Sequence, residues 1–144
     1  MRRMNRRTLL QAAPLSMLLP AGIMEAMPQT SSAKVYELRI YQAAPGKLDS
    51  LVARFREHTD KLFAKHGMTS LAYWTALDEP AKSSTFFYIL EHPSREAAAA
   101  NWKAFQDDPE WQAAKAKSEE NGKLVDKVDS TYLTLTDFSK VPRT

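Results

Sequence analysis

The segment VYELRIYQAAPGK, residues 35–47, begins as a strand pattern and ends as a turn pattern. Side chains of a β-strand point alternately to its two faces, so this strand would have one apolar face and one face with charged and phenolic groups. Pro45 and Gly46 then suit a tight turn, because proline presets φ and glycine tolerates the bend. The apolar face would hold Tyr36, Leu38 and Ile40, and the opposite face Glu37, Arg39 and Tyr41.

A long helix and a strand hairpin are predicted next. Residues 48–66 place apolar side chains at positions i, i+3, i+4 and i+7, which is typical of an amphipathic helix of about five turns. Gly67 follows in the position of a left-handed C-terminal cap. Residues 68–77 and 85–92 are rich in aromatic and β-branched side chains, and the polar loop between them predicts a hairpin.

The C-terminal part of the chain predicts two short helices and a final strand. Ser94 and Asp108 are residue types that cap helix N-termini, and Pro109 suits the first helical position. Residues 129–138 alternate threonine or tyrosine with leucine, which is a strand pattern. The order β-α-β-β-α-β, with the second helix split, predicts an α+β fold: a ferredoxin-like four-stranded antiparallel sheet with helices on one face.

We expect the helices to cover the apolar face of this sheet and to leave the polar face open. An open face with so much aromatic area is not expected to stay exposed. Two copies packed face to face, or closed into a barrel, would cover it and enclose an apolar chamber with a few polar groups, which describes a ligand pocket. The covered face would hold Tyr36, Leu38, Ile40, Leu133 and Leu135; the open face would hold Glu37, Arg39, Tyr41, Tyr132, Thr134 and Thr136, with either Trp74 or Tyr73 and either Phe87 or Phe86 with Tyr88.

The first 33 residues follow the order of an export signal. Four arginines come first, an apolar run from Leu9 to Met24 follows, and residues 31–33 offer a small-residue cleavage site. The apolar run is shorter than a transmembrane helix requires, and two prolines interrupt it. Residues 5–10, NRRTLL, are similar to the twin-arginine export motif, and the alternative is a general secretory signal with paired arginines. We therefore expect a cleaved signal at 1–33, a mature domain at 34–140 and a periplasmic or secreted location.

The composition of the mature part excludes several classes of function. The whole chain has 20 basic and 17 acidic residues; residues 1–33 hold four arginines and one glutamate, which leaves 16 of each sign. A neutral domain has no basic field to attract nucleic acid or an anionic membrane. The chain has no cysteine, no paired-histidine metal motif and no phosphate-binding loop, so no metal and no cofactor is expected.

Four motifs stand out along the mature chain: VYELRIY at 35–41, PGK at 45–47, KHG at 65–67 before Tyr73-Trp74, and DPEW at 108–111. Together they resemble the NIPSNAP family of the dimeric α/β-barrel superfamily, over nearly all of residues 35–138. The resemblance implies ferredoxin-like units that pair into eight-stranded barrels, with the polar face of the first strand in a shared cavity. The family has no settled activity, and its superfamily includes cofactor-free monooxygenases, small-molecule isomerases and haem-binding enzymes. Residues 89–92, Ile-Leu-Glu-His, depart from the Leu-Trp-x-Tyr that is common in the family. Any cluster of aromatic side chains that the family forms there would have fewer members in this chain.

Glu37 and Arg39 would orient a polar ligand or take part in acid–base chemistry, or would form a structural pair. Tyr41 and Tyr132 would hydrogen-bond a ligand oxygen or the other subunit. His66, at the end of the long helix, would carry protons at the barrel mouth or pack as a C-terminal cap. The candidate ligand-binding residues are Glu37, Arg39, Tyr41, Trp74, His66 and Tyr132.

The expected function is an exported homodimeric barrel that binds a small apolar or aromatic molecule. One alternative is a cofactor-independent monooxygenase or isomerase that acts on such a molecule. Another is a scaffold whose barrel is filled by its own side chains. Haem held by His66 or His58 is a further alternative to the absence of a cofactor.

Overall fold

A four-stranded antiparallel sheet forms around β1 (Val35–Ala43), the strand expected from the first segment. The computed structural model describes residues 34–140, and the predicted export signal at residues 1–33 lies outside them. The strand order is β2-β3-β1-β4, so β1 pairs with both β3 and β4. The other strands are β2 (Thr69–Thr75), β3 (Thr85–His92) and β4 (Val125–Leu133).

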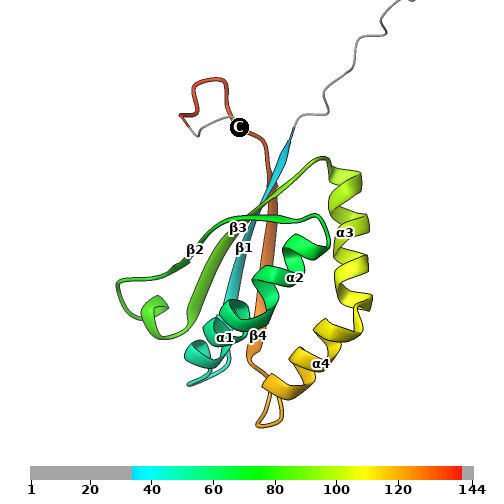
Figure 1. The fold of residues 1–144 in the computed structure, drawn as a ribbon. Helices are drawn as coiled ribbons and strands as arrows, with labels where there is room; N and C mark the ends of the chain where they lie inside the picture. The colour runs from blue at the N-terminus through cyan, green and yellow to red at the C-terminus, as the bar shows by residue number, and fades with distance from the viewer. Residues whose placement is uncertain (1–33, 141–144) are drawn as a thin grey trace, which may run out of the picture. The chain divides into compact units, whose positions relative to one another are not determined.

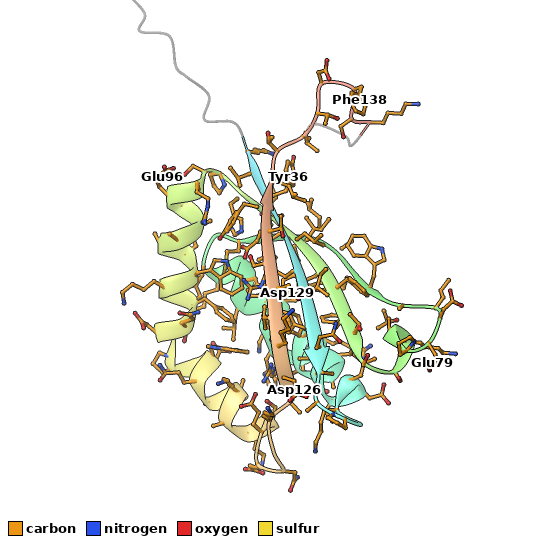
Figure 2. All side chains as sticks on the ribbon, turned by 180° about the vertical axis from the view of Figure 1, so that it is seen from behind. Tyr36, Glu79, Glu96, Asp126, Asp129 and Phe138 are labelled. Atoms are coloured by element: carbon orange, nitrogen blue, oxygen red, sulfur yellow. The ribbon has the colours of Figure 1, made fainter. Side chains whose placement is uncertain are left out.

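The helices lie on one face of the sheet, and Figure 2 looks onto the other face, which carries no helix (Figures 1 and 2). This arrangement confirms the predicted ferredoxin-like order, with the second helix split at Asp108. Within the described residues, no helix is long and apolar enough to cross a membrane. The helical elements are α1 (Leu48–Arg54), η1 (Phe55–Thr59), α2 (Asp60–Lys65), a short η2 (Ala81–Ser83), α3 (Arg95–Asp107) and α4 (Pro109–Ser118).

The predicted helix boundaries are confirmed where capping residues mark them. Ser94 Oγ accepts a hydrogen bond of 3.0 Å from the N–H of Ala97 at the start of α3. Asp108 Oδ1 accepts one of 2.8 Å from the N–H of Glu110 at the start of α4. Gly67, with a φ of 74°, ends the long helix in the left-handed conformation that glycine adopts most easily.

The long helix contains a π-helical segment, η1, between α1 and α2. Its buried side chains recur every four residues, at Leu51, Phe55, Thr59 and Phe63. An α-helix has 3.6 residues per turn, so side chains spaced four residues apart would drift gradually around the helix axis and away from the sheet. The wider π turn compensates for part of that drift, and the Thr59 hydroxyl bonds the Arg54 carbonyl at 3.3 Å across it. The sequence predicted the helix but not this segment.

The predicted assignment of the two sheet faces is wrong. The side chains of Glu37, Arg39 and Tyr41 point toward the helices, because Trp102 of α3 bonds Glu37 and Phe55 of η1 packs on Tyr41. Polar groups can occupy this covered face because the helices supply matching donors and aromatic rings. Cross-strand pairing places the apolar set on the open face: Leu38, Ile40, Phe87, Ile89 and Trp74.

The last strand begins and ends earlier than predicted. Strand β4 ends at Leu133, which pairs with Tyr36, and only Val35 of β1 lies beyond that pair, so β1 is too short to continue the pairing through residues 134–138. Phe138 accordingly lies beyond the end of the sheet (Figure 2) and is 80% exposed. The faces predicted for Thr134, Leu135 and Thr136 therefore have no counterpart in the sheet. The start of β4 lies before the predicted strand: Lys127 pairs with Gln42 and Val125 with Ala43 of β1.

Candidate functional site

The buried carboxylate of Glu37 lies at the centre of the polar groups between the sheet and α3. Its Oε1 accepts hydrogen bonds of 2.7 Å from Arg39 Nη1 and from Ser130 Oγ. Its Oε2 accepts one of 2.7 Å from Trp102 Nε1 and lies 2.9 Å from His92 Nε2. These five side chains, from β1, β3, β4 and α3, form the Glu37 cluster.

The Glu37 carboxylate is ionised at neutral pH. Its side chain is only 1% exposed, and burial raises the pKa because it disfavours charge. The four hydrogen bonds outweigh burial and lower the pKa from 4.5 to about 2. An ionised carboxylate can only accept, so the nearby His92 Nε2 carries a proton and donates it.

Arg39 connects the Glu37 cluster to two tyrosines. Its guanidinium carbon lies 4.3 Å from the centre of the Trp102 ring, which is cation–π geometry. Its Nη2 donates to the Tyr41 hydroxyl at 3.3 Å, and the Tyr88 hydroxyl donates to the same oxygen at 2.9 Å. Burial raises the pKa of Tyr88 well above its ordinary value, so Tyr88 remains a donor.

His92 is the member of the cluster with unused bonding capacity. Its side chain is fully buried, and its Nδ1 has no hydrogen-bond partner among the described residues. With the proton on Nε2, a neutral imidazole leaves a bare lone pair on Nδ1, which is the geometry of a base oriented by a carboxylate. The pairing of His92 with Glu37, which lies on the neighbouring strand, was not predicted from the sequence.

A cleft of about 280 Å³ opens between η1 and the β2–β3 hairpin. Its apolar walls include three aromatic rings, and those of Tyr73 and Phe86 stack at 5.8 Å with an angle of 4° between their planes. Phe55 packs edge-on against both of these rings. We call it the η1 cleft, and it is lined by Val52, Phe55, Arg56, Asp60, Tyr73 and Phe86.

The polar rim of the η1 cleft is held by Asp60. Its Oδ1 accepts hydrogen bonds from the Tyr73 hydroxyl, at 2.7 Å, and from the Ser70 hydroxyl. Burial and this bond to Asp60 raise the pKa of Tyr73 well above its usual value, so Tyr73 donates at neutral pH. Asp60 also borders a second hollow of about 250 Å³ next to Gly67 and Met68. The η1 cleft was not predicted, because its walls come from a helix and two strands that are separate in the sequence.

The family model for NIPSNAP matches residues 36–140 of this sequence. The chain belongs to the NIPSNAP family. A search of the curated proteins finds no match.

Solved structures of NIPSNAP proteins share this fold. An uncharacterized NIPSNAP-like domain protein from Burkholderia xenovorans is 18% identical, with a TM-score of 0.64 over 75% of this chain and 90% of that one. A NIPSNAP family protein from Agrobacterium tumefaciens is 21% identical, with the same TM-score and the same two coverages. At these identities the similarity shows the fold and does not transfer a ligand or a reaction.

In this NIPSNAP chain the six predicted site residues do not converge on one place. Glu37, Arg39 and Tyr41 lie together, and Tyr132 lies beside them, with its ring centre 6.1 Å from that of His92. Trp74 is 47% exposed on the open face of the sheet. His66 lies elsewhere, with Nε2 2.6 Å from Asp108 Oδ2.

The bond between His66 and Asp108 matches the structural alternative for this histidine. It joins the end of α2 to the start of α4. Hydrogen bonds from Lys65, from His66 and from the N–H of Glu110 hold the pKa of Asp108 well below its usual value. Asp108 is therefore ionised at neutral pH, and its bond with His66 connects α2 to α4.

The three histidines lie in different parts of the described domain. His58 is partly exposed with Nε2 3.9 Å from Glu57, His66 is bonded to Asp108, and His92 is buried in the Glu37 cluster. None of them lines the η1 cleft. No group of three or more histidine or acidic side chains in residues 34–140 is arranged to hold a metal ion.

Proposed function

We propose that the mature protein is a homodimer that binds a small apolar or aromatic molecule in the η1 cleft. The observation that carries this proposal is the cleft itself, a concave site with a wall of stacked rings and two polar groups at its rim. Ligand sites have this composition, and a volume of about 280 Å³ is at the lower end of their range, which suits a molecule of one or two rings. The binding site is therefore assigned to the η1 cleft and not to a chamber around Glu37.

The homodimer is supported by the open face of the sheet. Leu38, Ile40, Phe87 and Ile89 form an apolar surface there, and Trp74 at its border is 47% exposed. A surface of this kind on a small domain is typical of an interaction site. A second copy packed on the same face would cover it with an equally apolar surface, which is the isologous contact of a two-fold dimer.

A cofactor-independent monooxygenase or isomerase is the second candidate function. It is favoured by one observation: the ring of His92 is oriented by the ionised Glu37, and its Nδ1 has no hydrogen-bond partner among the described residues. His92 is fully buried and lies outside the η1 cleft, so it would act as a base only on a molecule held against the Glu37 cluster. Binding of a molecule without its conversion to a product would favour the pure binding function.

Filling the η1 cleft is expected to abolish ligand binding. Val52 lines the cleft and is only partly buried, so Val52→Phe adds a ring to the cleft without displacing the core. We expect 2-naphthol or 2-naphthoate, followed by fluorescence, to bind the wild type and to bind Val52→Phe at least about tenfold more weakly. Ala99→Phe, on the exposed side of α3, is the matched control and should bind as the wild type does. If neither probe binds the wild type, or if both variants bind equally well, the proposed site is wrong.

Export by the twin-arginine route is proposed from the sequence of residues 1–33. This route carries folded proteins, which suits a dimer that assembles before export. We expect Arg6→Lys with Arg7→Lys to retain the precursor inside the cell, measured by fractionation and immunoblotting. Arg2→Lys with Arg3→Lys is the matched control and should leave export intact. Export of both variants would instead indicate a general secretory signal.

A further inference from the structure

The η1 cleft contains one cation without a partner. Arg56 lines the cleft, and no hydrogen bond or ion pair joins it to any residue in the range 34–140. Two other arginines of the domain are used by the fold, since Arg54 bonds Glu119 at 3.0 Å and Arg39 bonds Glu37 at 2.7 Å. Arg56 therefore retains the full bonding capacity of its guanidinium group.

The acidic group at the same rim is already engaged. Asp60 accepts hydrogen bonds from the hydroxyls of Tyr73 and Ser70, so part of its capacity is used within the fold. It lies four residues after Arg56, but the two side chains form no ion pair. Both hydrogen bonds to Asp60 end on its Oδ1, whereas none of the donors of Arg56 is used within residues 34–140, so Arg56 is the rim group with the larger free capacity and its natural partner is an anion.

The π-helical segment sets the relation between this cation and the aromatic wall. Segment η1 begins with Phe55, which is buried against Tyr73 and Phe86, and the next residue is the exposed Arg56. The apolar wall and the cation are therefore adjacent along the chain and both border the same cleft. Single π-helical turns inside α-helices are frequently found at functional sites, which is consistent with a ligand here.

We propose that the η1 cleft binds a planar aromatic carboxylate, with its ring against Phe55, Tyr73 and Phe86 and its carboxylate on Arg56. This inference rests on the proposed binding function and names the class of ligand. A carboxylate matches the two parallel donors of a guanidinium group, and a flat ring matches the stacked pair of Tyr73 and Phe86. The volume of about 280 Å³ limits the ligand to one or two rings.

Three probes of one shape separate the charge from the ring: 2-naphthoate, neutral 2-naphthol and 2-naphthylmethylammonium. We expect the wild type to bind 2-naphthoate about tenfold more tightly than 2-naphthol at pH 7, and to bind the ammonium compound most weakly. Arg56→Gln should remove the preference for 2-naphthoate and leave the affinity for 2-naphthol unchanged. Arg56→Lys should restore part of the preference, because it restores the charge but not the fork of donors.

The matched control is Lys61→Gln, which removes one positive charge from the same helix outside the cleft and should leave all three affinities unchanged. Equal binding of 2-naphthoate and 2-naphthol by the wild type, or an unchanged preference in Arg56→Gln, would overturn the carboxylate proposal and leave the cleft as a neutral aromatic site. Tightest binding of the ammonium compound would overturn it in favour of Asp60. Binding of none of the probes would overturn the proposed function as well.

Discussion

The substitution Glu37→Gln is expected to destabilise the protein by about 3–5 kcal/mol, because it leaves the Arg39 charge buried without its partner. The amide keeps the shape of the side chain but replaces one acceptor oxygen by a donor. At that position the new NH₂ group faces two existing donors, either Arg39 and Ser130 or Trp102 and His92. A domain of this size has a free energy of unfolding of about 5–15 kcal/mol, so the loss is a large part of its stability.

The pH dependence of unfolding provides a second measurement of the same effect. The pKa of Glu37 is about 2 in the folded protein and 4.5 in its ordinary state. A pKa lowered by folding adds stability that is fully present above pH 4.5 and is lost as the pH falls from 4.5 toward 2. The shift corresponds to about 3 kcal/mol in the wild type, and Glu37→Gln should lack this part of the acid dependence.

The matched control for Glu37 is Glu91→Gln on β3. Glu91 pairs with Lys34 at 2.9 Å near the surface, and such pairs contribute about 0–1 kcal/mol. Urea unfolding of both variants at one protein concentration, at pH 7 and at pH 3, compares the two carboxylates directly. Equal unfolding midpoints for the wild type and Glu37→Gln at pH 7 would show that the cluster contributes nothing to stability.

The order of the elements could be predicted because several helix boundaries have a local chemical signal. Gly67 ends the long helix, and Ser94 and Asp108 begin the next two through bonds to nearby N–H groups. The bounds of β4 were predicted wrongly because they depend on which residues of β1 are available for strand pairing, and these are Tyr36 to Ala43. The π-helical segment was missed because its spacing of four residues is close to the 3.6 of an α-helix.

The candidate site could be predicted only where its residues are close in the sequence. Glu37, Arg39 and Tyr41 alternate along one strand, so their common face followed from strand geometry. Which face the helices cover did not follow, because polarity alone favoured the wrong one. The donors Trp102 and His92 were not predicted, since they reach Glu37 from segments 65 and 55 residues away.

The substitution Ile40→Lys is expected to convert the proposed homodimer into a monomer. Ile40 lies on the central strand β1, opposite Phe87 on the open face of the sheet. In the dimer it would contact the other copy, where an ammonium group has no water and no partner, at a cost of several kcal/mol. A loss of about 4 kcal/mol raises the dissociation constant about a thousandfold.

The monomer itself should tolerate Ile40→Lys. The open face meets water in a single copy, so the new ammonium group would be hydrated there; Asp129, opposite Ile40 on β4, is already paired with Lys127 at 2.8 Å. The variant should therefore remain folded by circular dichroism while it sediments as a monomer. This separates loss of the interface from loss of the fold.

Sedimentation of residues 34–144 at micromolar concentration checks this expectation. The wild type should sediment as a dimer, and so should the control Ala99→Lys, which places the same charge on the exposed side of α3. A wild type that sediments as a monomer would rule out the homodimer. A dimer that persists in Ile40→Lys would mean that the copies meet elsewhere, because an apolar interface centred on β1 cannot accommodate two unpaired ammonium groups related by its two-fold axis.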